Sequence, residues 1–119
     1  GMCILRPGVA GMSENITVRS IVGRFLEHHR IFYFFNHGQE DIYLSSADWM
    51  ERNFFRRVEI AFPILDHALK KRVVEEALKP YLKDNLQSWL MQADGKYRRL
   101  GKRAKPYSAQ DSLLNKLKL

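Results

Sequence analysis

The sequence predicts an α+β fold, a mixed α/β sandwich with an antiparallel hairpin at its centre. One observation is a run of β-branched and aromatic residues that is interrupted by a polar, glycine-containing loop. Another is an apolar stripe at helical spacing over Asp66–Lys83. The 119 residues, 45% hydrophobic and 28% charged, have an ordinary globular balance and suit one modest domain with a small core.

Four segments have the composition of strands. Arg30–Phe35 and Ile42–Leu44 flank the polar loop at residues 36–41, which predicts a hairpin. Ile16–Val22 begins with alternating apolar and polar residues, and Val58–Ile64 is a further apolar run.

The long helix is predicted at Asp66–Lys83. Asp66 can cap its start, and apolar residues recur at every fourth position from Leu69 to Tyr81. Pro80 is expected to kink the helix or end it early, because proline removes a backbone donor and clashes with the preceding turn.

The remaining segments are shorter. Asn85–Gln92 suits a strand, although its leucines also fit a helix, and a turn follows at Asp94-Gly95. Ser108–Leu119 resembles a short helix, with Ser108 as its cap and Asp111 three residues later.

The N-terminal residues carry no targeting signal. Met2–Leu5 is predicted as a short strand that stops at the Arg6-Pro7-Gly8 turn, which makes Cys3 a buried, unreactive strand cysteine. No apolar run is long enough to cross a membrane, and there is no signal-peptide pattern. A single cysteine forms no internal disulfide, so we expect an intracellular protein.

The excess positive charge is concentrated at the C-terminal end. Residues 95–119 hold eight Lys and Arg residues and one acid, Asp111, which accounts for the whole net charge of +7. Such a basic segment attracts nucleic acid, polyphosphate, nucleotide phosphates or an anionic membrane. Alternatively, the segment is a solvated basic tail without a polyanion partner, and the charge alone does not distinguish these two interpretations.

A phosphate-handling site is predicted where the hairpin strands begin and end. His28 and Arg30 are two residues apart and share a face of the first strand, as do Ser46 and Asp48 if the second strand stays extended. Arginine binds phosphate oxygens in pairs, and histidine supplies charge or a proton. Arg52 follows closely and, with Asn53, Arg56 and Arg57, widens the positive field.

Simpler interpretations account for the same residues. A histidine at a strand end is commonly a surface residue, Ser and Asp at a strand exit are commonly helix caps, and Trp49-Met50 would then be core. His29 should face away from His28. A zinc site is not predicted, because there is one cysteine and no close His/Cys spacing. Phosphate-loop, dinucleotide and serine-elbow motifs are absent from the sequence.

Two long stretches carry a family resemblance. RPGVAGMSENITVRSIVGRFLEHHRIFYF and YLSSADWMERNFFRRVEIAFPI closely resemble the C-terminal part of bacterial polyphosphate kinase, over about residues 3–100. The resemblance implies a phospholipase D-like domain with a mixed sheet and flanking helices. It implies that residues 1–119 are the C-terminal domain of a larger enzyme, with 95–119 as its basic C-terminal segment.

The phospholipase D pattern is His-x-Lys followed by Gly-Ser-x-Asn. This sequence resembles it in a degenerate form, with His28-x-Arg30 and Ser45-Ser46-x-Asp48. Phe35 stands where that pattern has an aspartate five residues after its lysine. This departure counts against a working phosphodiesterase.

The resemblance also implies a reaction. Polyphosphate kinases reversibly transfer the ATP γ-phosphate to polyphosphate with Mg²⁺, through a phosphohistidine in the preceding domain. By this resemblance His28 is a second essential histidine that contacts nucleotide phosphate. We expect Arg30, Arg6 and Arg52 to contact or guide phosphate, and Ser46 and Asp48 to hold the imidazole. Magnesium ligands are expected outside this chain, which alone should be inactive.

The implied partners are ATP or ADP, inorganic polyphosphate, the other domains of the enzyme and further copies of it in a homo-oligomer. The implied location is the bacterial cytoplasm, with peripheral membrane association compatible with the basic tail. Three rival hypotheses stay open. One is a nucleic-acid module that stacks bases on Phe32, Tyr33 and Tyr97. Another is a phospholipase D-type hydrolase with His28 as nucleophile. The last is a packing module with an apolar face.

Overall fold

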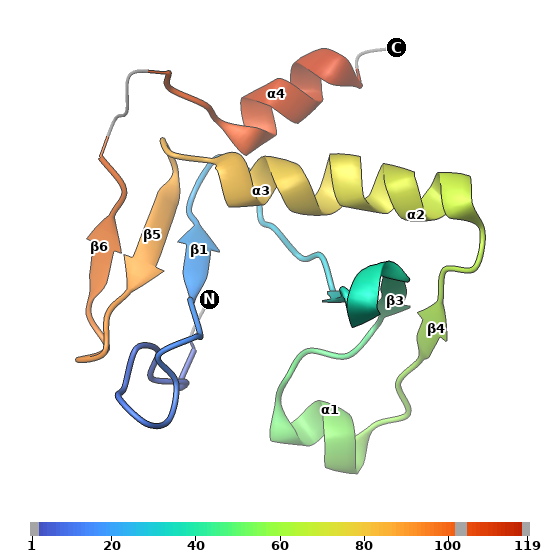
Figure 1. Cartoon of the computed structure of the whole chain (residues 1–119), viewed down its shortest axis with the longest axis horizontal. Coiled ribbons are helices and arrows are strands. Elements are labelled where there is room, and N and C mark those ends of the chain that lie inside the picture. The colour runs from blue at the N-terminus through green and yellow to red at the C-terminus, as the bar shows by residue number, and fades with distance from the viewer. Residues whose placement is uncertain (1–2, 102–104, 118–119) are drawn as a thin grey trace. The chain divides into compact units, whose positions relative to one another are not determined.

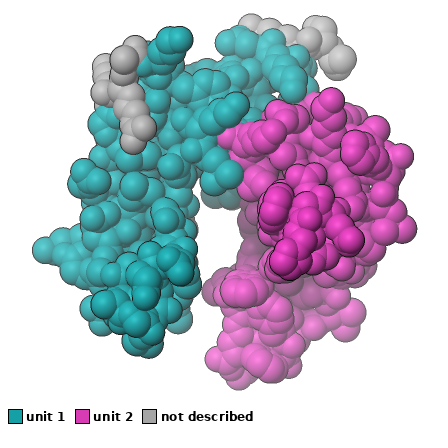
Figure 2. Space-filling model, in the orientation of Figure 1, with its two compact units in different colours: residues 1–27, 80–119 teal, residues 28–79 magenta. Residues whose placement is uncertain are grey.

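The computed structural model describes residues 3–101 and 105–117. It contains two compact units, one formed by residues 1–27 and 80–119 and the other by residues 28–79 (Figure 2). The chain therefore passes from the first unit to the second at Glu27–His28 and returns at Lys79–Pro80. Each unit holds its own three-stranded sheet.

The predicted hairpin forms the sheet of the second unit. Its strands are β2 (Ile31–Phe34), β3 (Asp41–Ser45) and β4 (Ala61–Pro63), in the order β2-β3-β4 with antiparallel pairing. A 3₁₀ turn, η1 (Asn36–Gly38), closes the hairpin. A short helix that the sequence did not predict, α1 (Glu51–Arg56), lies between β3 and β4.

The loop of the hairpin needs left-handed backbone. Asn36, His37 and Gly38 have φ angles of 39°, 53° and 92°. Asparagine and glycine adopt this region readily, and histidine does so more often than most residues. The polar, glycine-containing composition of the loop thus encodes the reversal that pairs β2 with β3.

The sheet of the first unit joins distant segments. Its strands are β1 (Arg19–Ile21), β5 (Ser88–Met91) and β6 (Tyr97–Arg99), in the order β1-β5-β6, again antiparallel. The alternative left open for the segment containing β5 is decided in favour of a strand. The predicted turn before β6 is confirmed, with Gly95 at φ +83°, whereas β6 itself was not predicted.

The long helix continues through Pro80. It consists of α2 (His67–Val73), a π-helical turn, η2 (Val74–Leu78), and α3 (Lys79–Lys83) (Figure 1). The predicted cap is present, since Asp66 accepts a hydrogen bond from the Leu69 amide at 2.8 Å. The Lys79 amide donates to the Val74 carbonyl, so the widened turn comes directly before Pro80. The helix is therefore not ended early, because a π turn changes the hydrogen-bond register next to the missing donor.

The C-terminal helix α4 (Ala109–Lys116) is capped as predicted, with Ser108 Oγ accepting from the Asp111 amide at 3.2 Å. It packs beside a buried carboxylate. Asp84 is 1% exposed and accepts from the amides of Gln87 at 2.7 Å and Ala109 at 2.8 Å. One buried acid thus joins the start of α4 to the segment before β5.

The predicted N-terminal strand is not found. Met2 lies outside the described residues, and residues 3–6 have no regular secondary structure. Cys3 is exposed, so the prediction of a buried cysteine is wrong. The chain turns instead at Pro7–Ser13, where the Gly8 amide donates to the Ser13 carbonyl at 2.8 Å. None of the described strands pairs with residues 3–6.

The α+β fold class predicted from the sequence is confirmed, with the strands divided between the two sheets. Trp49, which the simpler interpretation placed in the core, is 80% exposed. In the part of the chain that the structure describes, no helix has the length and apolar character needed to span a membrane.

Candidate functional site

Three of the predicted site residues form one cluster. Asp48 Oδ1 lies 2.8 Å from Arg30 Nε and 3.0 Å from His28 Nε2. Arg30 Nη2 lies 2.6 Å from the same His28 nitrogen. We call these residues the His28–Arg30–Asp48 cluster. It combines an imidazole, a guanidinium and a carboxylate within hydrogen-bond distance of one another.

The hairpin brings these side chains together. His28 and Arg30 lie just before β2, and Asp48 lies three residues after the end of β3. The Ser45 amide donates to the Arg30 carbonyl at 3.0 Å, which extends the pairing of the strands to this end of the hairpin. Antiparallel pairing therefore places residues close together that are 18 to 20 positions apart in the sequence.

The three groups have a charge arrangement suited to binding an anion. The Arg30 guanidinium, and then the His28 ring, lower the pKa of the Asp48 carboxyl, so the carboxylate stays charged at neutral pH. Asp48 in turn fixes the orientation of Arg30 through its Nε, leaving a guanidinium held in place beside an imidazole. Such a pair can bind two oxygens of one phosphate group.

His28 Nε2 faces a donor and an acceptor at once. When this nitrogen is unprotonated it accepts from Arg30, and when it is protonated it donates to Asp48. An incoming phosphate oxygen is an acceptor, so it can replace Asp48 as the partner of the protonated nitrogen. The His28 side chain is 56% exposed, compared with 25% for Arg30 and 30% for Asp48, so the imidazole is the most accessible of the three groups.

Ser46 is not placed against the imidazole. Its hydroxyl donates to Glu59 Oε2 and accepts from the Ile60 amide at 3.0 Å. The expectation that Ser46 holds His28 is therefore corrected: β4 pairs with β3, and the segment leading into β4 brings a carboxylate to Ser46 instead.

Glu59 was missed by the sequence reasoning. It accepts from Ser46 and also from Asn53 Nδ2 at 2.6 Å, and these two hydrogen bonds, in that order, lower the pKa of its carboxyl. The network fixes the segment two residues before Asp48. The available signal was an acid directly after Arg56, Arg57 and Val58 in a segment predicted as a strand.

The other predicted phosphate ligands lie elsewhere. Arg52 is exposed on α1. Arg6 belongs to the first unit, where its Nε donates to the Ala93 carbonyl at 3.1 Å. Among the described residues of the second unit, no hydrogen bond or ion pair joins Arg52 to the His28–Arg30–Asp48 cluster.

Part of the basic C-terminal segment has a structural use. Arg99 donates from Nε and Nη2 to the Leu86 carbonyl, and Lys96 lies 3.5 Å from Asp94 Oδ2. Arg98 and Lys105 are exposed. Lys102, Arg103 and Lys118 lie outside the described residues.

Comparison with known proteins identifies the family. Residues 1–110 match the family model described as polyphosphate kinase C-terminal domain 2. The chain belongs to the polyphosphate kinase C-terminal domain family. It is 66% identical over 116 residues to a polyphosphate kinase of Paraburkholderia phytofirmans and 68% identical over 99 residues to one of Burkholderia ambifaria. These matches cover 98% and 83% of this chain, but 17% and 14% of the relatives.

The fold agrees with a solved structure of the same family. The chain superimposes on the crystal structure of polyphosphate kinase from Porphyromonas gingivalis with a TM-score of 0.91 and 36% sequence identity. The match covers 98% of this chain and 18% of the other. The resemblance stated from the sequence motifs, including the phospholipase D-like fold, is thus confirmed.

A polyphosphate kinase domain raises the question of magnesium. Among the described residues, no group of three or more His, Cys, Asp or Glu side chains is arranged to hold a metal ion. The one carboxylate of the cluster, Asp48, is already occupied by Arg30 and His28. The residues that the structure describes therefore do not fit a magnesium site.

Proposed function

We propose that residues 1–119 are the C-terminal phospholipase D-like domain of a polyphosphate kinase, with 95–119 as its basic segment. The enzyme transfers the γ-phosphate of ATP to inorganic polyphosphate, and the reaction is reversible. The observation that carries this proposal is the exposed cluster in which Asp48 holds Arg30 beside His28.

The reaction is proposed to run in two phosphoryl transfers. A histidine outside this chain attacks the γ-phosphorus, a P–N bond forms, the bond from the γ-phosphorus to the bridging oxygen breaks, and ADP leaves. A terminal polyphosphate oxygen then attacks the phosphorus of the phosphohistidine, a P–O bond forms, the P–N bond breaks, and the chain grows by one phosphate. Neither step requires covalent chemistry from this domain.

This domain supplies binding and charge stabilisation. Phosphoryl transfer depends mainly on positioning and on stabilising charge at the transferred and leaving oxygens. Arg30 binds a pair of phosphate oxygens, and the protonated His28 donates to the oxygen on which charge develops. Asp48 orients both groups. Because His28 touches the phosphate, we propose it as the catalytic residue of this domain.

The other predicted residues have auxiliary roles in the proposal. Arg6, Arg52 and the basic segment guide the polyanion by long-range attraction. Ser46 acts through Glu59, which holds the chain ahead of Asp48. Magnesium arrives with the nucleotide or is held outside this chain. The enzyme works as a homo-oligomer in the bacterial cytoplasm, with peripheral membrane contact through its basic segment.

The proposal is tested first by polyphosphate binding to the 119-residue chain at two salt concentrations. Wild type is compared with His28→Ala and with His67→Ala, which removes another exposed histidine, at the start of α2. We expect His28→Ala alone to lose the component of binding that survives high salt. Equal, steeply salt-dependent binding by all three proteins would contradict the proposal, because the basic segment would then act as a general polyanion attractor.

The full-length enzyme gives the second test. His28→Ala should lower turnover about 10²-fold or more, since positioned proton donors and charge stabilisers are each worth that much. His67→Ala should leave turnover unchanged. Near-normal turnover in His28→Ala would refute the assignment.

A further inference from the structure

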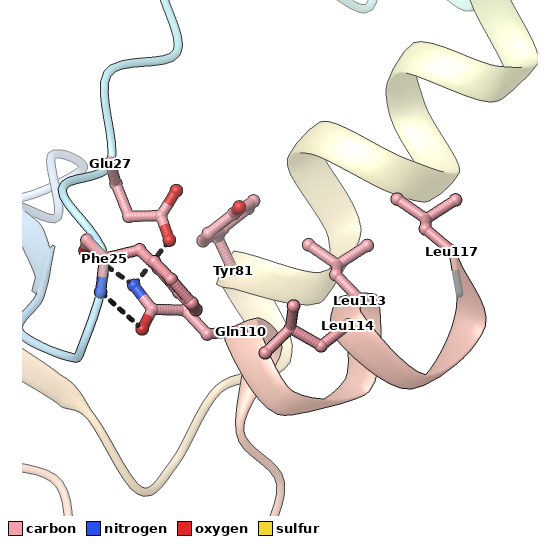
Figure 3. Close-up of a pocket in the computed structure, with 7 residues that line it drawn as sticks. All are labelled: Phe25, Glu27, Tyr81, Gln110, Leu113, Leu114 and Leu117. Carbon is pink, nitrogen blue, oxygen red and sulfur yellow. Dashed lines mark hydrogen bonds between the residues drawn. The ribbon is translucent and has the colours of Figure 1, made fainter. Parts of the chain in front are cut away.

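The segment that leads into His28 is held by the C-terminal helix. Gln110, on α4, is 4% exposed. Its Oε1 accepts from the Phe25 amide at 3.1 Å, and its Nε2 donates to the Phe25 carbonyl at 2.8 Å (Figure 3). One side chain thus pairs with both backbone groups of one residue, as a neighbouring strand would.

The same amide also reaches Glu27. Gln110 Nε2 donates to Glu27 Oε1 at 2.6 Å. Tyr81 donates its hydroxyl to the Glu27 carboxylate, and burial together with this hydrogen bond raises the pKa of Tyr81. Phe25, Glu27, Tyr81 and Gln110 are called the Gln110 clamp below. All four belong to the first unit and line one cavity of about 390 Å³ with Leu113 and Leu114 of α4 and Leu117, which follows the helix (Figure 3).

The clamp coincides with both places where the chain changes units. Glu27 is the last residue before the chain enters the second unit, and Tyr81 is the second residue after it returns. The Glu27–Tyr81 hydrogen bond therefore ties the outgoing segment to the returning segment. The residue after Glu27 is His28, and Arg30 follows two positions later.

Gly23 shows how closely the clamp fits. A Cβ atom added at Gly23 would lie 2.5 Å from Gln110 Oε1 and 2.7 Å from Gln87 Oε1. Both distances are well below normal contact. The absence of a side chain at this position therefore allows the buried glutamine to approach the backbone.

We propose that Gln110 is a positioning residue that, with Glu27 and Tyr81, fixes the backbone from which His28 and Arg30 project. This inference rests on the proposed function, because it makes the C-terminal helix part of the support of the phosphate site. It assigns no contact with substrate to the clamp.

The kinetic test uses the full-length enzyme that contains this chain, assayed well below its melting temperature. Gln110→Ala is compared with Gln92→Ala, a control that removes a local hydrogen bond to the Leu90 carbonyl. We expect Gln110→Ala to lower kcat about tenfold or more with KM for ATP nearly unchanged, since small misplacement of catalytic groups is costly. A purely structural role would lower Tm and leave kcat intact, which would overturn the proposal.

A milder variant keeps the test decisive if Gln110→Ala fails to fold. Tyr81→Phe retains the ring and removes the hydroxyl that binds Glu27. We expect kcat to fall about two- to fivefold, in line with the loss of one hydrogen bond that orients Glu27. An unchanged kcat in folded Tyr81→Phe would contradict the clamp.

A spectroscopic test separates the clamp from the kinase proposal. In the 119-residue chain, Gln110→Ala should shift the imidazole NMR signals of His28 and leave those of His67 in place. Unmoved His28 signals would overturn the clamp, whatever His28→Ala does to turnover. Shifted signals together with normal turnover in His28→Ala would support the clamp and refute the proposed function.

Discussion

Asp84 and Asp48 show how the two units use the same side chain. Asp84 is almost completely buried and accepts hydrogen bonds from the amides of Leu86, Gln87 and Ala109. Asp48 is partly exposed and accepts from Arg30 and His28. The neutral backbone donors around Asp84 occupy its carboxylate oxygens, and these hydrogen bonds hold the fold together. Side-chain donors of Arg30 and His28 surround the second carboxylate, and these donors can also bind another acceptor.

The difference teaches where chemistry can be sought in this chain. A buried polar group must be satisfied by the protein, because leaving it unpaired is costly. The donors around Asp84 are therefore committed. Around Asp48, the guanidinium and imidazole retain capacity for a further partner, since Arg30 and His28 carry more donors than one carboxylate oxygen uses.

Removing the structural carboxylate should have the largest effect. Asp84→Ala leaves three buried or partly buried amides without an acceptor, so we expect a loss of about 3–4 kcal/mol in the free energy of unfolding. Denaturant unfolding measures this change in the free energy of unfolding. The control is Asp94→Ala, in the exposed turn before β6, which should cost far less. Equal losses of unfolding free energy in Asp84→Ala and Asp94→Ala would contradict a structural role for the Asp84 carboxylate.

Filling the close approach at Gly23 should have the next largest effect. In Gly23→Ala the new methyl group meets Gln110 and Gln87, so we expect a loss of about 1–3 kcal/mol in the free energy of unfolding. Gly101→Ala is the control, because a Cβ there would meet no atom within 4 Å among the described residues. Thermal unfolding of both proteins checks this. A stable Gly23→Ala would show that Gln110 is not closely packed.

Neutralising the Asp48 carboxylate should alter activity more than stability. In the full-length enzyme, Asp48→Asn should lower kcat about tenfold, because the amide no longer fixes Arg30. The affinity for polyphosphate at low salt should not fall, since the substitution removes a negative charge from the proposed phosphate site. Asp41→Asn makes the same charge change at the other end of the hairpin and should leave kcat unchanged. A parallel fall in kcat and affinity in Asp48→Asn would contradict the positioning role.

The acid titration of Asp48 should show the smallest effect. Because Arg30 and His28 lower its folded pKa, their stabilisation is present above the unfolded pKa. It is lost only as the pH falls through the lower folded value. In Arg30→Gln the carboxyl should titrate nearer its ordinary pKa, as measured by ¹³C NMR. The Asp94 carboxyl, whose pKa is lowered mainly by the Lys96 amide, should not change. An unmoved Asp48 would mean that Arg30 is not its main partner.

Local signals in the sequence predicted the elements with short-range causes. The hairpin loop at residues 36–41 and the caps Asp66 and Ser108 depend on residues at most a few positions away. The pairing of His28 and Arg30 with Asp48 was also predictable, because a hairpin fixes which residues meet. The family resemblance rests on the same local motifs, and the comparisons confirm it.

Long-range contacts explain what the sequence reasoning missed. Strand β6 is short and exists through pairing with β5, and helix α1 lacks a capping side-chain hydrogen bond. The sequence prediction placed Ser46 against the imidazole, but its hydroxyl binds Glu59. Glu59 lies just before β4 and reaches Ser46 because β4 pairs with the other side of β3, and this pairing could not be predicted from local sequence. No periodicity of one segment predicts which distant segment will pack against it.

The sequence by itself determined the α+β class, the hairpin, the charge distribution and the residue types of the His28–Arg30–Asp48 cluster. Those properties follow from side-chain chemistry and from spacing along one or two adjacent strands. Only the tertiary structure decided that Asp84 is structural, that Ser46 serves Glu59, and that Gln110 holds the approach to His28. Gln110 and Phe25 are 85 residues apart, and folding alone brings them together, because a buried amide must find its partners wherever the chain places them.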